Sequence, residues 1–142
     1  MSNRRVVLDG DNIIKAMREN NSEIVATVVE VCDKITVNDL ILAEYAMRVK
    51  NVKALLAPLE KLKESRPVPK FINPQMKPVP DLQLPSRHKR LIAGAIRASA
   101  DILITNVRLR GRLADLAETL RNEHHLRVIS PDQYIAERGV SA

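Results

Sequence analysis

Short apolar runs alternate along the chain with longer segments in which apolar residues recur at every third or fourth position. The short runs predict buried strands, and the longer segments predict amphipathic helices. The predicted strands cover residues 4–8, 33–37, 70–73, 101–105 and 126–129. The predicted helices cover residues 11–19, 23–32, 39–50, 52–63, 86–99 and 109–125, and a short terminal helix begins at 130–131. This alternation predicts a three-layer α/β/α fold around a central parallel sheet of about five strands.

Length and composition predict a single domain over residues 1–142. A chain of 142 residues with 45% hydrophobic residues is large enough to bury one core. Six of the eight prolines lie within residues 66–85, which indicates an extended crossing segment inside the domain. Because proline lacks a backbone N–H, helix 52–63 is expected to bend or restart near Pro58.

The cysteine content fits a reducing compartment. Cys32 is the only cysteine, which excludes a disulfide within the chain and a zinc site built on cysteines. Because it lies in an apolar helical run, Cys32 is predicted to be a small buried hydrophobic residue. The sequence shows no signal peptide and no membrane-spanning segment, so we expect a cytoplasmic protein without a membrane partner.

Positive charge predominates, with a formal net charge of +6 from 23 basic and 17 acidic residues. Much of it lies in two stretches, residues 45–80 and 86–112. A basic balance favours polyanionic partners, although runs of charge also occur on ordinary solvated surfaces. Aromatic residues make up only 2% of the chain, which argues against RNA-binding modules that stack bases on aromatic side chains.

The most informative stretch joins the first predicted strand to the first predicted helix. Residues 6–13 read VVLDGDNI, so three apolar residues are followed by Asp9, Gly10, Asp11 and Asn12. Ligands of open α/β sheets bind at the carboxyl ends of the strands, and a strand that ends in Asp9 delivers an anion there. The alternative is that Asp11 or Asn12 only caps the helix. Asp9 is a less natural cap, because it lies two residues before Asp11.

Four blocks of sequence carry a resemblance to a known family. They are RVVLDGDNI at 5–13, VNDLILAEY at 37–45, KRLIAGA and ADILIT at 89–95 and 100–105, and RVISPDQY at 127–134. In this order, over nearly the whole chain, they resemble PIN domains, and in particular the branch of VapC-like toxin nucleases. The Asp-Gly-Asp-Asn sequence is also similar to the related NYN nucleases, which share the architecture.

The resemblance implies a Mg²⁺- or Mn²⁺-dependent endoribonuclease in which about four acidic residues surround one cleft. Matched position by position, the first acid is Asp9 and the second is Glu44. The third and fourth positions hold Lys89 and Val107 instead of acids. The catalytic residues implied for an active enzyme are Asp9, Asp11 and Glu44, and the implied metal ligands are these three together with Asn106.

The two missing acids argue against efficient cleavage. Asp11 is an extra carboxylate close to Asp9, and Asn106 offers a neutral oxygen one residue before the fourth position. An ammonium group about 4 Å from a divalent ion costs on the order of 8 kcal/mol at an effective dielectric of about 20. Lys89 therefore opposes metal binding unless it turns out to solvent, and it is able to pair with Asp9 or Glu44 in place of the metal.

These observations predict a PIN-like RNA-acting protein that binds RNA or a protein partner and has weak or no nuclease activity. The first alternative is an active Mg²⁺- or Mn²⁺-dependent endoribonuclease of the VapC toxin type. The second is a structural subunit of a ribonucleoprotein or protein assembly. The resemblance also implies an antitoxin or a second copy of the chain as partners. The residues predicted to contact RNA are Arg87, Lys89, Arg90, Arg108, Arg110 and Arg112.

Overall fold

The computed structural model describes residues 4–18, 22–65, 86–106 and 112–137, with side chains at all of these except 86–90 and 112–116. Five strands form one sheet, in which all neighbouring strands are parallel, in the order β3-β2-β1-β4-β5. They are β1 (Arg5–Leu8), β2 (Lys34–Val37), β3 (Lys63–Ser65), β4 (Ile102–Ile104) and β5 (Arg127–Ile129). β1 is central, because Val6 is aligned with Ile35 on one side and with Ile102 on the other.

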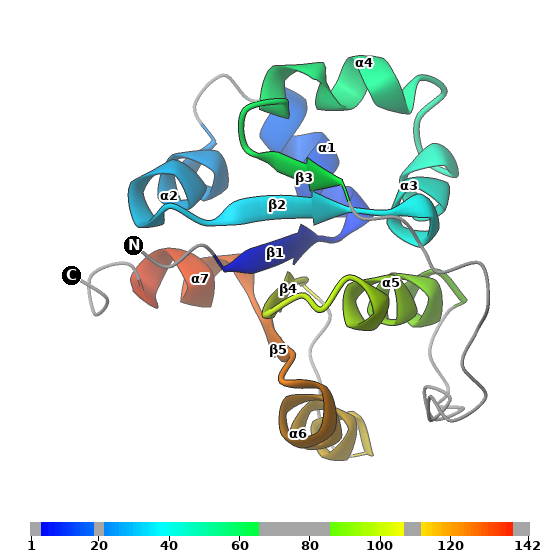
Figure 1. Cartoon of the computed structure of the whole chain (residues 1–142), viewed down its shortest axis with the longest axis vertical. Coiled ribbons are helices and arrows are strands. Elements are labelled where there is room, and N and C mark those ends of the chain that lie inside the picture. Colours follow the sequence, from blue (N-terminus) through cyan, green and yellow to red (C-terminus); the bar gives the residue numbers. More distant parts are fainter. Residues whose placement is uncertain (1–3, 19–21, 66–85, 107–111, 138–142) are drawn as a thin grey trace.

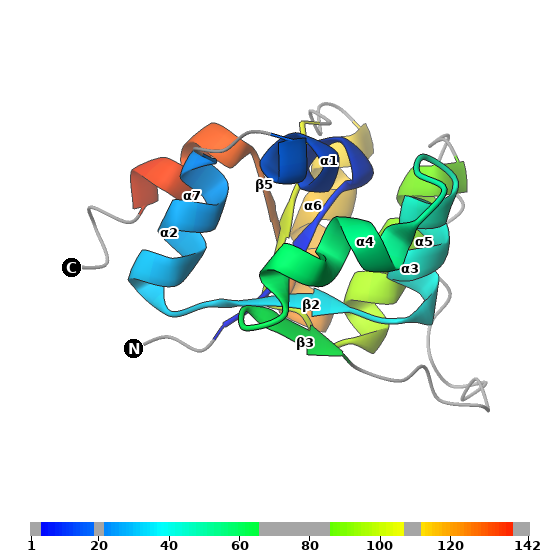
Figure 2. The same ribbon diagram turned by 90° about the horizontal axis from the view of Figure 1, so that it is seen from above.

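Helices lie on both faces of this sheet, so the predicted three-layer α/β/α fold with a five-stranded parallel sheet is confirmed (Figure 1). The helices of the described ranges are α1 (Gly10–Arg18), α2 (Glu23–Val31), α3 (Asp39–Ala46), α4 (Val52–Leu56), the 3₁₀ turn η1 (Ala57–Leu59), α5 (Ser86–Arg97), α6 (Arg112–His124) and α7 (Pro131–Glu137). Figures 1 and 2 both show α2 beside α7 at one end of the molecule, and α3 beside α5 at the end toward which the strands point.

The central strand fixes where the polar residues of the sheet must lie. Val6, Val7 and Leu8 are each 0% exposed, since a strand with helices on both faces buries every side chain. The first polar residue after this run is Asp9, which the chain therefore delivers to the carboxyl edge of the sheet, the edge formed by the carboxyl ends of the strands.

Close packing of α3 against α5 positions the second acidic residue. Asn38 caps α3 by accepting a hydrogen bond from the N–H of Ile41 (3.0 Å), and its Nδ2 donates to the carbonyl of Gly94 in α5 (2.8 Å). A Cβ on Gly94 would lie 2.8 Å from Cγ1 of Ile41, so a glycine permits this approach. The two helices thereby hold Glu44, one turn further along α3, near the same edge.

The element boundaries between residues 39 and 65 differ from the prediction. The predicted helix 39–50 ends at Ala46, because Asn51 starts a new helix by accepting a hydrogen bond from the N–H of Ala54 (3.0 Å). The predicted helix 52–63 is divided into α4 and η1 near Pro58, as expected, but it also ends early and is followed by β3. This edge strand, Lys-Glu-Ser, is held by backbone pairing with β2 and has no apolar pattern. The strand predicted at 70–73 lies outside the described residues.

The prediction that Cys32 is buried is wrong, because Cys32 is exposed. It is the C-cap of α2 and has a left-handed backbone with φ of 61°, from which its N–H bonds to the carbonyls of Val28 and Val29. This cap conformation ends the helix, so the apolar spacing of α2 no longer determines which way the next side chain points.

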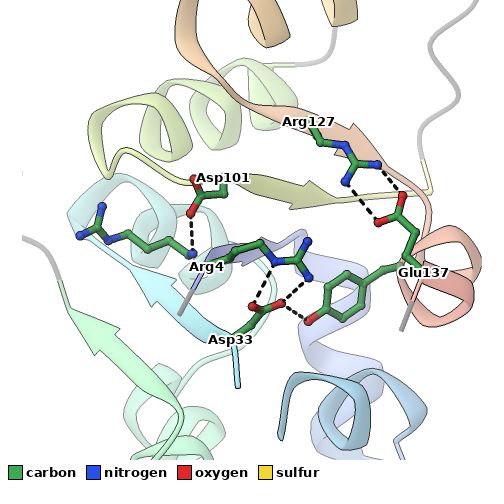
Figure 3. Close-up of polar contacts among 7 residues, drawn as sticks. Arg4, Asp33, Asp101, Arg127 and Glu137 are labelled. Atoms are coloured by element: carbon green, nitrogen blue, oxygen red, sulfur yellow. Dashed lines mark hydrogen bonds and ion pairs between the residues drawn. The ribbon is translucent and has the colours of Figure 1, made fainter. Parts of the chain in front are cut away.

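A buried carboxylate joins the first strand to the last helix at the opposite edge of the sheet (Figure 3). Asp33, whose side chain is 0% exposed, accepts hydrogen bonds from Nε and Nη2 of Arg4 at 3.2 and 3.0 Å. The hydroxyl of Tyr134 in α7 donates to the same carboxylate at 2.8 Å. Because a buried charge is tolerated only when it is paired and hydrogen-bonded, this network holds α7 against the start of β1.

Two further contacts at this edge bind neighbouring strands and helices. Arg127 of β5 pairs with Glu137 at the end of α7, and Asp101 accepts a hydrogen bond from the N–H of Arg5 at 2.9 Å (Figure 3). These polar groups at the amino edge therefore hold strands and helices together, whereas Asp9 lies at the carboxyl edge.

We expect Asp33→Asn to lower the free energy of unfolding by about 2 to 4 kcal/mol, because it removes a charge that two buried or half-buried donors require. The matched control is Glu60→Gln, since the Glu60 side chain is 64% exposed in its ion pair with Lys63. The control is expected to change the free energy of unfolding by less than about 1 kcal/mol. Urea denaturation followed by circular dichroism measures both, and equal losses in the two variants would contradict the assignment.

Candidate functional site

Asp9 organises the carboxyl edge of β1 and is 5% exposed. Its Oδ1 accepts hydrogen bonds from the backbone N–H and from Nδ2 of Asn12, both at 2.8 Å, and its Oδ2 accepts one from the hydroxyl of Thr105 at 2.7 Å. Since α1 begins at Gly10, Asp9 is the capping residue of this helix. The expectation that Asp11 or Asn12 is a more natural cap than Asp9 is therefore wrong, because Asp9 itself caps the helix. The Asp9 carboxylate connects β1, α1 and the residue that follows β4.

Tyr45 brings α3 to the same edge. It is 0% exposed, and its hydroxyl donates to the carbonyl of Leu8 at 2.6 Å. Burial raises the pKa of Tyr45 above its ordinary value, and the negative charges of Asp9 and Glu44 raise it further. The phenol therefore stays neutral and remains a hydrogen-bond donor beside two carboxylates.

Glu44 is a buried carboxylate with one unsatisfied oxygen. It is 3% exposed, and its Oε1 lies 3.9 Å from Nε of Arg48. Its Oε2 is buried and has no hydrogen-bond partner among the residues that the structure describes. A buried acceptor without a partner costs free energy, and in a native protein it indicates strain or a partner from outside the chain.

A guanidinium group contacts two of the three acids, an arrangement that we call the Arg48 bridge (Arg48 with Asp11 and Glu44). Nη1 of Arg48 forms an ion pair with Oδ1 of Asp11, while its Nε faces Glu44. Gly10 gives this side chain room, because a Cβ there would lie only 2.7 Å from Cδ of Arg48. One cation of the chain thus contacts two carboxylates and offsets one of their two negative charges.

Asn106 is exposed and lines a cavity of about 380 Å³ together with Asn12 and Lys15, and neither Asp11 nor Glu44 lines this cavity. Asp9 is hydrogen-bonded to Asn12, which lines the cavity, and to Thr105, which precedes Asn106 in the sequence. Of the four oxygen ligands implied by the resemblance, Asn106 therefore shares this cavity with neither Asp11 nor Glu44.

The residues at this edge do not fit a bound Mg²⁺ or Mn²⁺ as they stand. Within the described part of the chain, no group of three or more His, Cys, Asp and Glu residues is arranged to hold a metal ion. Asp9 already accepts three hydrogen bonds, and Asp11 and Glu44 face Arg48. Such cations require several free oxygen ligands around one point, which this arrangement does not offer.

The predicted RNA-contacting residues can be placed only by their helices. Arg87, Lys89 and Arg90 lie in the first two turns of α5, and Arg112 is the first residue of α6. The first turns of α5 lie beyond the carboxyl ends of the strands, beside α3 (Figure 1). Because α6 leads from β4 to its parallel neighbour β5, its start lies toward the same edge. Arg108, Arg110 and Val107 lie outside the described residues.

Sequence reasoning missed Arg48 and Thr105. Arg48 follows Glu44 by four residues, a spacing at which opposite charges meet on a helix, so this signal was available. Thr105 carried no comparable signal, because its hydrogen bond to Asp9 joins residues 96 positions apart.

Comparisons with known proteins do not identify a family. A scan of the sequence against protein-family models finds no match, and a search of curated proteins finds no relative. Within the described ranges, no helix is both long enough and apolar enough to cross a membrane. The resemblance to PIN domains therefore stays a prediction.

The two tyrosines, Tyr45 and Tyr134, provide a test of the buried geometry, since the chain has no other tyrosine and no tryptophan. Burial raises the pKa of Tyr134 as well, and its hydrogen bond to Asp33 adds to the shift. The folded state holds both protons more tightly than the unfolded state, so stability is fully present below about pH 10 and falls as the pH rises above it.

We expect the ultraviolet absorbance of tyrosinate to appear only together with the loss of circular dichroism. In urea, the same absorbance should appear near the ordinary tyrosine pKa of about 10. The variant Tyr45→Phe should halve the final absorbance. Ionisation of either tyrosine near pH 10 in a protein that remains folded would contradict the assigned burial.

Proposed function

We propose that this chain is a PIN-like RNA-binding domain with weak or no metal-dependent nuclease activity. The observation that carries the proposal is the Arg48 bridge. At the edge where the resemblance implies free carboxylates, Asp11 and Glu44 already contact a cation of the chain. Asp9 is engaged in three hydrogen bonds. Arg48 offsets part of the negative charge at this edge and engages the carboxylates that a divalent cation would need, so the site is less suited to gather such cations.

The distribution of positive charge supports an RNA partner. Arg87, Lys89 and Arg90 lie within four residues at the start of α5, the helix that packs against α3, which carries Glu44. Basic side chains that contact phosphates supply most of the sequence-independent affinity for nucleic acids. With a net charge of +6, the chain as a whole also attracts polyanions more strongly than cations.

A second candidate function is a Mg²⁺- or Mn²⁺-dependent endoribonuclease that uses Asp9, Asp11 and Glu44. The observation that favours it is the buried Oε2 of Glu44, which lacks a partner among the described residues and would accept a bond to an external cation. In this case Arg48 has to leave the acids before the reaction. The two candidates therefore differ in whether the native protein cuts RNA when a metal is supplied.

The first test is binding of a fluorescent mixed-sequence RNA, measured by anisotropy in the presence of a chelator at several salt concentrations. Replacement of Arg87, Lys89 and Arg90 by alanine should weaken binding at least about tenfold and reduce the log–log salt slope by about 2, at about 0.7 for each phosphate contact. The matched control replaces three cations toward the amino edge, Lys61, Arg97 and Arg121. Equal losses in both triple variants would show that net charge alone drives binding.

The second test is cleavage of the same RNA with Mn²⁺, with Asp9→Asn as the partner variant. Asparagine also caps helices, so this variant is expected to fold while it lacks the carboxylate charge. We expect the native protein to bind RNA without cutting it, and Asp9→Asn to bind equally well. Cleavage that requires both Mn²⁺ and Asp9 would establish the nuclease instead. A folded protein that neither binds nor cuts would favour the structural-subunit alternative.

A further inference from the structure

We propose that Arg48 controls this site by competing with divalent cations for Asp11 and Glu44. The inference rests on the proposed function, because it explains how a site of this type loses part of its negative charge and its free carboxylates without losing its acids. While the Arg48 bridge is formed, its guanidinium pairs with one oxygen of each carboxylate. When Arg48 turns away, their oxygens become available to an external cation.

The first observation behind this inference is that the Arg48 bridge satisfies Glu44 incompletely. Arg48 approaches only Oε1 of Glu44, and at 3.9 Å, whereas Oε2 is buried without a partner among the described residues. A guanidinium that belonged here only for structure would be expected to pair with both oxygens, as Arg does with carboxylates elsewhere in proteins. The same chain shows that arrangement at its other edge, where Arg4 bonds both oxygens of Asp33.

The second observation is that the Arg48 bridge can open without disturbing the core. The Asp11 side chain is 63% exposed and that of Arg48 is 20% exposed, so the outer ion pair is in contact with water. Exposed ion pairs contribute little to stability and separate readily. The inner partner, Glu44, is held independently by α3, which is fixed through Tyr45 and Asn38.

The third observation is that the absence of a side chain at Gly10 allows Arg48 to form the Arg48 bridge. A Cβ on residue 10 would lie 2.7 Å from Cδ and 2.8 Å from Nε of Arg48. Alanine at position 10 would displace the flexible side chain of Arg48. The backbone of Gly10 does not have a positive φ, so it can accommodate alanine without strain. Gly10→Ala therefore opens the Arg48 bridge by geometry alone, with every charge in the chain retained.

The experiment compares Mn²⁺ affinity by isothermal titration calorimetry in the native protein, Arg48→Gln and Gly10→Ala. If the Arg48 bridge is formed in about nine molecules of ten, only about one native molecule in ten is able to bind Mn²⁺. Both variants should then bind Mn²⁺ about tenfold more tightly, because nearly all of their molecules are able to bind it. Lys50→Gln removes the same charge from an exposed position two residues away, and we expect it to leave the affinity unchanged. In the Arg48→Gln background, Glu44→Gln should abolish the gain.

The inference is overturned if folded Arg48→Gln binds Mn²⁺ no more tightly than the native protein, or if its gain survives Glu44→Gln. Should Arg48→Gln fail to fold, Gly10→Ala decides in its place, since alanine is a better helix former than glycine. RNA affinity in the presence of a chelator is measured on the same samples. A native protein that does not bind RNA refutes the proposed function, whereas unchanged Mn²⁺ affinity with intact RNA binding refutes only the role of Arg48.

Discussion

The structure of the carboxyl edge depends on how buried carboxylates are compensated. Val6, Val7 and Leu8 of β1 are apolar and buried, so the acid that follows them, Asp9, enters a space with little water. Three hydrogen bonds meet its charge, and they join α1 and the end of β4 to the central strand. A charge that costs much free energy when unpaired thereby determines where three elements meet.

The same constraint acts on Glu44 with a different outcome. Its helix is packed so closely on α5 that only a glycine at position 94 permits the contact. The carboxylate arrives 3% exposed, with one oxygen near Arg48 and the other unsatisfied among the described residues. Asp9 is thus a structural carboxylate by its contacts, while Glu44 retains the capacity to bind something more. Asp9 therefore holds the site together, whereas Glu44 is able to bind a ligand in it.

How far the sequence predicts this molecule depends on the range of the interaction involved. Apolar strands such as 101–105 and caps such as Asn38 depend on neighbours in sequence, and the layered parallel fold follows from them. β3 was missed because a short, partly buried edge strand held by backbone pairing needs no apolar pattern, and Cys32 was misplaced because a left-handed cap ends the helical spacing. The contact between Gly10 and Arg48 could not be predicted. It joins residues 38 positions apart in the sequence and depends on where the Arg48 side chain lies in the folded protein.

A cation of the chain, Arg48, takes the place beside Asp11 and Glu44 where the resemblance implies a metal ion. The most direct measurement is the anomalous scattering of manganese in crystals of the native protein grown with millimolar Mn²⁺. We predict that Arg48 contacts Asp11 in these crystals and that any manganese peak beside Glu44 is much weaker than in crystals of Arg48→Gln grown in the same way. Equally strong manganese peaks beside Glu44 in the native protein and in Arg48→Gln would contradict the account.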